Sequence, residues 1–461
     1  MLGHFYFSTF KDKMLLTNDA GNYMLLSRED FNSFVKGKAI STPEIQKDLQ
    51  HRMFCSDESV EGYVRYCENE MREGNRYLFE STNLFIFAIT NECNNRCMYC
   101  QANGTRAMKQ MNIDVAEQAL IRISECPAKN ITIEFQGGEP LMNFPVIKYI
   151  VNRATEILSE KEVGFTLVTN LSLITTEMAQ FIKDNHISVS TSMDGPAALH
   201  DLNRPAANGF SSFAAMQRGK ELLDEYGIKA GAIQTTTKAS LAYPKEIVKS
   251  YIDNGFRQIF LRPLTRLGAA AKCWDQIGYK PEEFLAFYRT ALAEIIEYNK
   301  REIPIVEYHA ALFLSKILQG KAVNYMELRS PCGAAIGQMA ITASGNVYTC
   351  DEGRMIAESG DEAFLLGNVF DSGYNDWINS SCCKAICSAS LLETLPGCCD
   401  CVYKPYCGVC PVINYAINGS ITRVSRDRCR IYKGILDILF EYLYINDGEV
   451  LRIFSEWSEQ A

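Results

Sequence analysis

The sequence predicts an α/β protein whose central part is a partial (β/α)6 barrel, preceded by a small winged-helix-like domain and followed by a cysteine-rich domain. Three observations support this. β-rich runs alternate with helical stretches after residue 80, the first 75 residues hold short strands followed by helices, and eleven of the 18 cysteines lie beyond residue 331. We therefore expect four segments, at residues 1–75, 80–325, 326–430 and 431–461.

The barrel is predicted from six short runs with strand-like composition, each separated from the next by an amphipathic segment. The runs lie at 84–90, 131–135, 164–169, 187–193, 230–236 and 258–262. Helical periodicity occurs between them at 115–124, 145–159, 176–184 and 213–226. Strands that alternate with helices form βαβ units with a parallel sheet, and their chemistry lies at the carboxyl ends of the strands. Six such repeats predict an open barrel.

The flanking segments have different patterns. Residues 1–75 contain two or three short strands and then helices that begin near Ser27 and Ser41, which is the order of a winged-helix-like unit. The region beyond residue 330 is rich in Gly and Cys and poor in regular periodicity, as expected where metal ligation replaces a hydrophobic core. Residues 431–457 are predicted as a helical tail that is interrupted at residues 446–448.

Composition excludes several classes of function. The formal net charge is −9 and no basic block stands out, so a nucleic-acid partner or an anionic membrane surface is not expected. No apolar run approaches membrane-spanning length, and the N-terminus lacks a secretory signal pattern. We expect a cytoplasmic protein. In a reducing compartment, so many cysteines are expected to bind metal rather than to form disulfides.

The first chemical motif follows the first barrel strand. Cys93, Cys97 and Cys100 form a CxxxCxxC run, and three thiolates at this spacing can hold three corners of a [4Fe–4S] cube while its fourth iron stays open. The alternative is a zinc loop. The second strand ends in Gly137, Gly138 and Glu139, where glycines allow a ligand to approach the backbone and the carboxylate can receive an ammonium group.

Together these motifs resemble those of the radical S-adenosylmethionine (SAM) superfamily, over residues 84–430. The resemblance implies that the three cysteines hold the SAM-binding cluster, that the GGEP strand end contacts the SAM amino group, and that Tyr99 lies by the adenine. It also implies that Ser192 and Arg204 meet the SAM carboxylate. Asn170 matches the family's TNG, except that Leu171 replaces the glycine. His200 is as readily a structural hydrogen-bonding group and stays outside this set.

A second constellation of cysteines follows the barrel. It comprises Cys332, Cys350, Cys398, Cys401, Cys407, Cys410 and Cys429. Alternating CxxC pairs are also typical of zinc ribbons, but the string resembles the SPASM extension, which binds two auxiliary [4Fe–4S] clusters. The resemblance assigns Cys332, Cys350 and Cys410 to an inner cluster, and Cys398, Cys401, Cys407 and Cys429 to an outer one.

This string departs from the SPASM pattern at two places. The usual CxxxC is shortened to CxxC at 407–410, and Gln338 stands where a further cysteine is usual. The inner cluster then has either an open iron or a fourth ligand from Cys382, Cys383 or Cys387, and we include Cys387 among the candidate ligands.

The two ends of the chain, MLLTNDAGNYMLLSREDF and PGCCDCVYKPYCGVCPVINY, are similar to the His-Xaa-Ser-system radical SAM maturases. This resemblance implies a peptide maturase that cleaves SAM reductively and abstracts hydrogen from a ribosomally made precursor peptide, to form a crosslink or an oxidised residue. It also implies SAM, three [4Fe–4S] clusters and an external electron donor such as flavodoxin or ferredoxin. The alternatives are a sulfatase-type maturase that forms formylglycine and a non-catalytic zinc-binding protein.

Two further hypotheses concern the substrate. Asp351 follows Cys350, and the pair is similar to one in sulfatase-type maturases where the aspartate is a base. We therefore expect Asp351 to accept a proton or orient the substrate, unless it only caps a turn. Residues 1–75 are expected to bind a leader segment of the peptide as an added strand, the alternative being a domain that covers the barrel opening.

Overall fold

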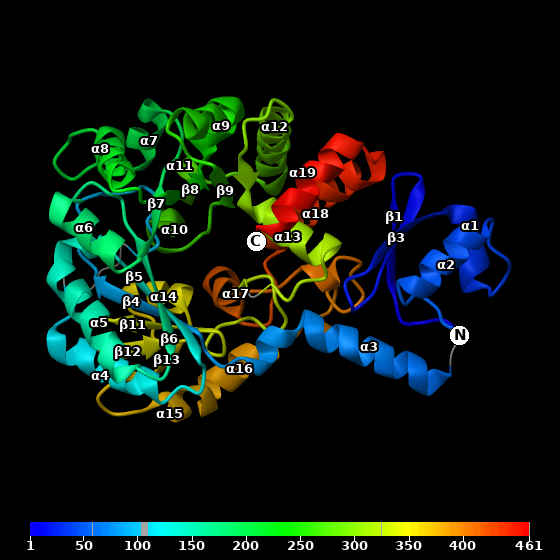
Figure 1. Cartoon of the computed structure of the whole chain (residues 1–461), viewed down its shortest axis with the longest axis horizontal. Helices are drawn as coiled ribbons and strands as arrows, with labels where there is room; N and C mark the ends of the chain where they lie inside the picture. The colour runs from blue at the N-terminus through cyan, green and yellow to red at the C-terminus, as the bar shows by residue number, and fades with distance from the viewer. Residues whose placement is uncertain (58, 103–108, 324, 461) are drawn as a thin grey trace.

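The computed structural model describes residues 1–57, 59–102, 109–323 and 325–460 (Figure 1). The described chain contains two sheets. A three-stranded antiparallel sheet has the order β1-β2-β3, and a ten-stranded sheet has the order β10-β9-β8-β7-β6-β5-β4-β11-β12-β13. The N-terminal sheet lies to one side of the molecule in Figure 1, and the barrel lies on the other.

Six consecutive parallel strands form the predicted barrel. Each strand pairs with the next along the chain, so the six are neighbours in the order of the sequence. Their bounds are β4 Leu84–Thr90, β5 Asn130–Gly137, β6 Glu162–Val168, β7 Ser188–Ser192, β8 Ala230–Thr236 and β9 Gln258–Pro263. The predicted partial (β/α)6 barrel is confirmed, and all six strands lie where the sequence indicated.

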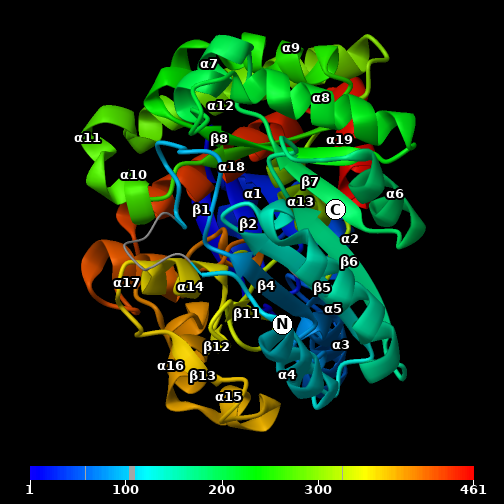
Figure 2. The same ribbon diagram turned by 90° about the vertical axis from the view of Figure 1, so that its left-hand side faces the viewer.

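Helices cover the outer face of these strands, because each crossover between parallel strands carries one (Figure 2). They are α4 Ile113–Ser124, α5 Phe144–Ile157, α6 Thr176–Asp184, α7 Ala197–Asn203, α8 Ser212–Glu225 and α9 Pro244–Asp253. The apolar stripes of α4, α5 and α6 and the outward side chains of β4–β7 share one core, with Phe85, Phe87, Ile133 and Phe135 fully buried.

A second core surrounds β8 and β9 and takes in side chains of α7, α8 and α9. The short helices α10 (Gly268–Lys272) and α11 (Trp274–Ile277) lead into α12 (Pro281–Lys300), the edge strand β10 (Val306–Glu307) and α13 (Tyr308–Leu318). This core also takes in the C-terminal helices α18 (Arg426–Ile445) and α19 (Gly448–Glu459). The predicted interruption of the tail is confirmed: Asn446 ends α18 at φ 60°, and the Asp447 side chain caps α19.

The cysteine-rich region continues the barrel sheet. β11 (Gln338–Thr342) pairs in parallel with β4, and the antiparallel strands β12 (Asn346–Tyr348) and β13 (Leu365–Asn368) extend the sheet from there. The helices of this region are α14 Asp351–Glu358, α15 Tyr374–Asn379, α16 Ser381–Ala389, η4 Leu392–Thr394, η5 Lys404–Tyr406 and α17 Pro411–Asn418. The pairing of β11 with β4 brings this region to the side of the barrel where the first cysteine motif begins.

The N-terminal unit has the predicted order of strands and helices. β1 (Tyr6–Phe10), β2 (Lys13–Thr17) and β3 (Tyr23–Ser27) are followed by α1 (Arg28–Val35), α2 (Pro43–His51) and α3 (Val60–Gly74). The unit is anchored to the C-terminal part: Thr17 Oγ1 donates to the carbonyl of Val402 at 2.6 Å, and Lys404 Nζ bonds Asp19 at 2.9 Å. In the part of the chain that the structure describes, no helix is long and apolar enough to cross a membrane.

Candidate functional site

The loop that carries Cys93, Cys97 and Cys100 follows β4 and is held by backbone hydrogen bonds. Arg96 N donates to the carbonyl of Pro205 at 2.8 Å, and Met98 N donates to that of Asn203 at 2.9 Å. On the other side, Ala269 N in α10 donates to the carbonyl of Cys100 at 2.9 Å. A three-cysteine loop without regular secondary structure is therefore held in place by backbone hydrogen bonds to its neighbours.

Gly137 and Gly138 allow the end of β5 to cross this loop closely. A Cβ atom on Gly137, which has φ +153°, would lie 2.2 Å from the carbonyl oxygen of Thr90, and one on Gly138 would lie 2.0 Å from that of Glu92. Gly138 N and Glu139 N donate to these same two carbonyls at 2.7 and 2.8 Å. The two glycines are thus required by the approach of protein backbone, in addition to any ligand.

The carboxylate of Glu139 ties the ends of β5 and β6 together. It is 1% exposed. Oε1 accepts from Thr169 Oγ1 at 2.6 Å and from Leu141 N at 3.1 Å, while Oε2 accepts from Asn170 N at 2.8 Å. Burial raises the pKa of Glu139, and these three donors counteract that rise. Its expected contact with the SAM ammonium group stays a prediction.

Asn170 joins the same region to the cysteine loop. Its Nδ2 donates to Asn94 Oδ1 at 2.9 Å, and its Oδ1 accepts from Ser172 N at 2.9 Å. Leu171, which stands where glycine is usual, has φ +61° and is fully buried. This left-handed backbone explains the usual glycine, because a leucine there is strained.

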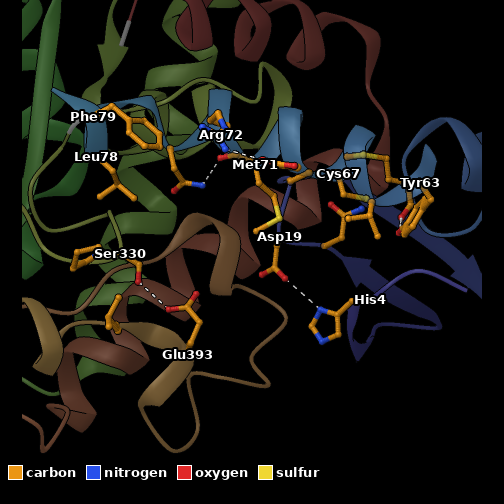
Figure 3. Close-up of a pocket in the computed structure, with 18 residues that line it drawn as sticks. His4, Asp19, Tyr63, Cys67, Met71, Arg72, Leu78, Phe79, Ser330 and Glu393 are labelled. Atoms are coloured by element: carbon orange, nitrogen blue, oxygen red, sulfur yellow. Dashed lines mark hydrogen bonds and ion pairs between the residues drawn. The ribbon is translucent and has the colours of Figure 1, made fainter. Parts of the chain in front are cut away.

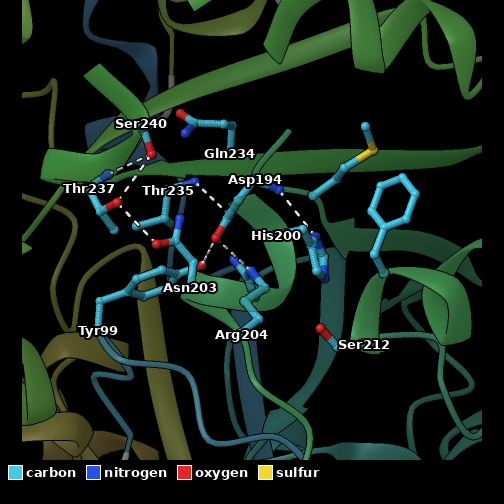
Figure 4. Close-up of polar contacts among 12 residues, drawn as sticks. Tyr99, Asp194, His200, Asn203, Arg204, Ser212, Gln234, Thr235, Thr237 and Ser240 are labelled. Carbon is cyan, nitrogen blue, oxygen red and sulfur yellow. Dashed lines mark hydrogen bonds and ion pairs between the residues drawn. The ribbon is translucent and has the colours of Figure 1, made fainter. Parts of the chain in front are cut away.

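Behind the cysteine loop, Tyr99, Asp194 and Arg204 form one polar cluster (Figure 4). Tyr99 OH donates to Asp194 Oδ2 at 2.6 Å, and Arg204 Nε lies 3.2 Å from the same oxygen as an ion pair. The Arg204 guanidinium lies over the Tyr99 ring, 5.1 Å from its centroid. Asp194 is fully buried and also accepts from Thr235 N at 3.2 Å. Sequence reasoning assigned no role to Asp194, although it lies two residues after Ser192.

Arg204 keeps donors for a ligand. Among the described residues its buried Nε makes no hydrogen bond, although it lies 3.2 Å from Asp194 Oδ2 as an ion pair, so the guanidinium can receive a carboxylate as the resemblance implies. Beside it, the side-chain amide nitrogens of Asn203 and Gln234 are buried and have no hydrogen-bond partner among the described residues. Buried donors are normally satisfied. These orphan donors fit a polar ligand of the kind that SAM is.

The other two residues of this segment differ in role. Ser192 ends β7, and its hydroxyl bonds no other described residue, so its SAM contact stays a prediction. His200 is 2% exposed, and its Nδ1 lies 3.4 Å from Asp194 N. Burial lowers the pKa of His200 to about 4. A neutral, hydrogen-bonding histidine agrees with the structural interpretation.

The three thiols of the first motif influence one another electrostatically. Burial raises the pKa of Cys97 to about 11, Arg204 lowers it, and Cys100 raises it further. The pKa of Cys93 is likewise raised to about 12, first by burial and then by Glu139, Cys97 and Cys100. Thiols with such pKa values become thiolate ligands when metal binding displaces the proton. We call Cys93, Cys97 and Cys100 the SAM triad.

Cys332, Cys350 and Cys410 come together in the cysteine-rich region, and we call them the inner group. All three are buried in one small core with Ile386. Burial raises the pKa of Cys332 to about 11, and it raises that of Cys410 well above its usual value, with further contributions from the other two thiols. The three side chains, which come from distant positions in the sequence, therefore pack in one core.

Cys387 lies at the margin of this group. It contributes the smallest of the effects on the pKa of Cys332, and its own pKa is lowered, first by a hydrogen bond with Cys383. Its role as a ligand stays a prediction.

Cys398, Cys401, Cys407 and Cys429 form the outer group. Burial raises the pKa of Cys407 to about 12, and Cys401, Cys429 and Cys398 each raise it further. Cys429 lies in the first turn of α18 and thereby joins the loop cysteines. Among the residues that the structure describes, no set of three or more His, Cys, Asp or Glu side chains is arranged to hold a single metal ion.

Asp351 directly follows Cys350 of the inner group, at the start of α14. Cys350 caps α14 by accepting from Gly353 N at 3.3 Å, and Asp351 is the first residue of that helix. Arg354 Nη2 bonds Asp351 Oδ1 at 2.6 Å, and its Nε bonds the same oxygen at 2.9 Å. Oδ2 has no partner in the described chain. Although burial alone would lower it, the pKa of Arg354 is raised by Asp351, Glu358 and Cys100.

The similarity of this chain to known proteins agrees with this geometry. The model of the radical SAM superfamily matches residues 87–258. An uncharacterized protein of Methanocaldococcus jannaschii is 34% identical over 265 residues, which are 58% of this chain and 83% of that protein. A cysteine-type anaerobic sulfatase-maturating enzyme of Clostridium perfringens is 26% identical over 283 residues, 58% of this chain and 74% of the enzyme.

Two solved structures share the fold. One is anSMEcpe with bound AdoMet, at a TM-score of 0.70 and 20% identity, covering 82% of this chain and 98% of that one. The other is Streptococcus suis SuiB bound to precursor peptide SuiA, at a TM-score of 0.56 and 15% identity, covering 93% and 98%. With its cysteine loop, its GGE strand end and its six parallel strands, the chain belongs to the radical SAM superfamily.

Proposed function

We propose that this protein is a peptide maturase that cleaves SAM reductively and abstracts hydrogen from a ribosomally made precursor peptide, forming a crosslink or an oxidised residue. The main support is that a radical SAM sequence match, the SAM triad and the inner group occur in one chain, with Asp351 held by Arg354 directly after Cys350. A substrate that contacts Asp351 would therefore lie near the inner group. The relatives include a sulfatase-maturating enzyme and, at the level of fold, a protein bound to its precursor peptide.

When bound, SAM and the cluster of the triad supply the 5′-deoxyadenosyl radical. The residues of this chain bind SAM and orient the reacting groups. Arg204, held by Asp194, receives the SAM carboxylate, and Glu139 fixes the strand ends that frame the ligand. The barrel positions the target carbon and limits the access of water.

Asp351 is the proposed proton acceptor. Oxidation of the substrate releases a proton as well as an electron, and Oδ2 of Asp351 is available because Arg354 uses only Oδ1. The inner and outer groups would hold the two auxiliary [4Fe–4S] clusters, one of which accepts the electron. Three cysteine groups thus support about twelve irons per chain.

Formation of formylglycine is the second candidate. It is favoured by the match to a cysteine-type sulfatase-maturating enzyme and by the Asp351 that follows Cys350. The two reactions differ in their products. A crosslink removes two hydrogens and joins residues, whereas formylglycine is an aldehyde at one residue.

The N-terminal unit is proposed to hold the leader segment of the peptide in an apolar groove (Figure 3). The groove has a volume of about 670 Å³ and is lined by Val64 and Met71 of α3, by Phe79, and by Ser330 and Pro331. α3 is amphipathic, yet it buries none of its side chains. An apolar helix face left in solvent suits a peptide partner. The groove reaches the residues that directly precede Cys332. A peptide bound in the groove would therefore be tethered near the inner group.

Substitution in α3 tests this role more cleanly than deletion of residues 1–75. Tyr6 and Phe10 pack in the second core, so deletion would uncover it. Val64→Asp should weaken binding of the precursor peptide at least tenfold, because a charge would enter the apolar groove. Arg65→Ala, on an exposed side chain of the same helix, is the control. Unchanged peptide binding by Val64→Asp would refute the groove.

The reaction itself is tested by anaerobic co-expression with the peptide encoded in the nearest small open reading frame, followed by mass spectrometry. A loss of two hydrogens that maps to two residues supports the crosslink, and an aldehyde supports formylglycine. SAM turnover with dithionite, read as 5′-deoxyadenosine, is measured separately. Colourless protein that binds zinc and yields no deoxyadenosine would contradict both.

A further inference from the structure

A second loop lies against the cysteine loop and follows α7. Asn95 and Ala206 form an antiparallel β-bridge, which joins the two loops. The base of the second loop is closed by Asp201, whose Oδ1 accepts from Phe213 N at 2.8 Å. Residues 202–211, which we call the 202–211 loop, are therefore held directly beside the SAM triad.

This loop presents two large apolar side chains to solvent. Phe210 is 78% exposed, more than any other large hydrophobic side chain among the described residues, and Leu202 is 55% exposed. The backbone at Phe210 is fixed, because Phe210 N donates to Asn208 Oδ1 at 3.1 Å. Aromatic side chains are enriched in the centres of protein interfaces. Two exposed apolar side chains on one loop therefore suit a contact with another protein.

Basic side chains lie on the segments that surround the SAM triad. Arg96, which stands between two of the triad cysteines, is exposed, and so is Lys272 of α10. Neither side chain forms an ion pair with another described residue. α10 adjoins the triad through the hydrogen bond from Ala269 N to the carbonyl of Cys100. Positive charge is thus available on two sides of the cysteine loop.

The charge of this region is opposite in sign to that of the whole chain. The region consists of the cysteine loop, the 202–211 loop and the segment of α10 and α11, at residues 91–101, 202–211 and 264–277. Its basic side chains are Arg96, Arg204, Arg266 and Lys272, and its acidic ones are Glu92 and Asp275. The region therefore has a formal charge of +2, whereas the chain has −9. Local charge of one sign steers a partner of the opposite sign.

The proposed cleavage of SAM begins with an electron from outside the chain. Cys93 of the SAM triad is exposed, so the cysteine loop reaches the surface of the molecule. A donor protein that binds at this surface would bring its own redox cofactor close to the triad. In that step the donor is oxidised by one electron and the SAM-binding cluster is reduced by one.

We propose that Arg96, Leu202, Phe210 and Lys272 form the docking face for an acidic one-electron donor protein of the flavodoxin class. The inference rests on the proposed function and names the surface that its reductant binds. Phe210 and Leu202 supply the apolar centre of the contact, and Arg96 and Lys272 attract the acidic partner.

The first test compares two reductants. Wild type and Phe210→Asp are reconstituted anaerobically and supplied with either the hydroquinone of an acidic bacterial flavodoxin or titanium(III) citrate, and 5′-deoxyadenosine is measured. Phe210→Asp should lower the flavodoxin-driven rate at least tenfold at limiting flavodoxin. It should leave the titanium-driven rate unchanged, because a small reductant needs no docking face. Raising the ionic strength from about 0.05 to about 0.5 M should slow the flavodoxin-driven rate of wild type, because salt screens the charges.

The second test measures binding without turnover. Titration calorimetry gives the Kd of oxidised flavodoxin for the reconstituted protein. Phe210→Asp and Arg96→Glu should each raise this Kd at least tenfold. Phe370→Asp is the matched control, since Phe370 is 50% exposed and lies after β13, outside the docking face. It should keep the wild-type Kd and rates.

Unchanged flavodoxin binding by Phe210→Asp would overturn the docking face. The assignment would also be wrong if Phe210→Asp dissociated a dimer, or weakened binding of the precursor peptide, while flavodoxin binding stayed the same. The surface would then belong to a second copy of the chain or to the peptide. Failure of wild type to form 5′-deoxyadenosine with either reductant would instead contradict the proposed function, and the calorimetry would still decide the docking face.

Discussion

Substitution of Asp194 by asparagine should destabilise the protein and weaken its binding of SAM. Asp194 is fully buried and is the counter-charge of Arg204, which is 8% exposed. Removal of one member of a buried ion pair costs about 3–5 kcal/mol. Asparagine keeps the shape of the side chain and one acceptor for Tyr99 or Thr235. We therefore expect a loss at the lower end of this range. A loss of about 3 kcal/mol corresponds to about 150-fold in the folding equilibrium.

A double-mutant cycle measures this pair directly. Urea unfolding under anaerobic conditions is compared for wild type, Asp194→Asn, Arg204→Met and the double variant, and SAM affinity is measured by calorimetry. The double variant should recover at least about 2 kcal/mol of the summed losses, because no charge is then left unpaired. Asp253→Asn, in an exposed pair with Lys249, is the control and should cost under about 0.5 kcal/mol. A coupling near zero would refute the reasoning.

Three further outcomes are expected. Replacement of Cys93, Cys97 and Cys100 by alanine should abolish deoxyadenosine formation while about eight of twelve irons remain; turnover at the wild-type rate would contradict the triad. Asp351→Asn should leave SAM cleavage without peptide intact but reduce product at least tenfold, and full product formation would remove its role as a base. His309 is buried with both ring nitrogens unpartnered in the described chain, and burial lowers its pKa to about 3. Stability should therefore fall as the pH drops from about 6.5 toward 3, by up to about 1.4 kcal/mol per pH unit from this group, and His309→Phe should reduce that slope in urea titrations at several pH values.

The barrel could be predicted from the sequence because its information is local. Each strand carries its own β-rich run, and the helix at Thr176–Asp184 has the bounds that the amphipathic pattern indicated. The SAM triad and the GGE strand end are contiguous motifs, so they too could be recognised in the sequence. The domain boundaries, the individual site roles and the likeness to His-Xaa-Ser-system maturases stay predictions.

What the sequence did not reveal is non-local. The pairing of β11 with β4 joins strands about 250 residues apart, and no periodicity encodes such a partner. The same holds for Asp194, whose importance comes from the Arg204 and Tyr99 side chains around it. The left-handed backbone at Leu171 could be expected from the sequence, because glycine is usual at this position of the motif.

The junction of β11 with β4 also bears on aggregation. β4 has the sequence LFIFAIT, and six of its seven residues are buried. As long as β11 is present, the backbone of β4 is paired on both sides. Removal of the chain beyond residue 330 would turn β4 into a flat, apolar edge, which is a template for intermolecular strand addition. The cysteine-rich region thus protects the edge of β4 from pairing with another chain. An isolated barrel should self-associate unless the edge of β4 is covered.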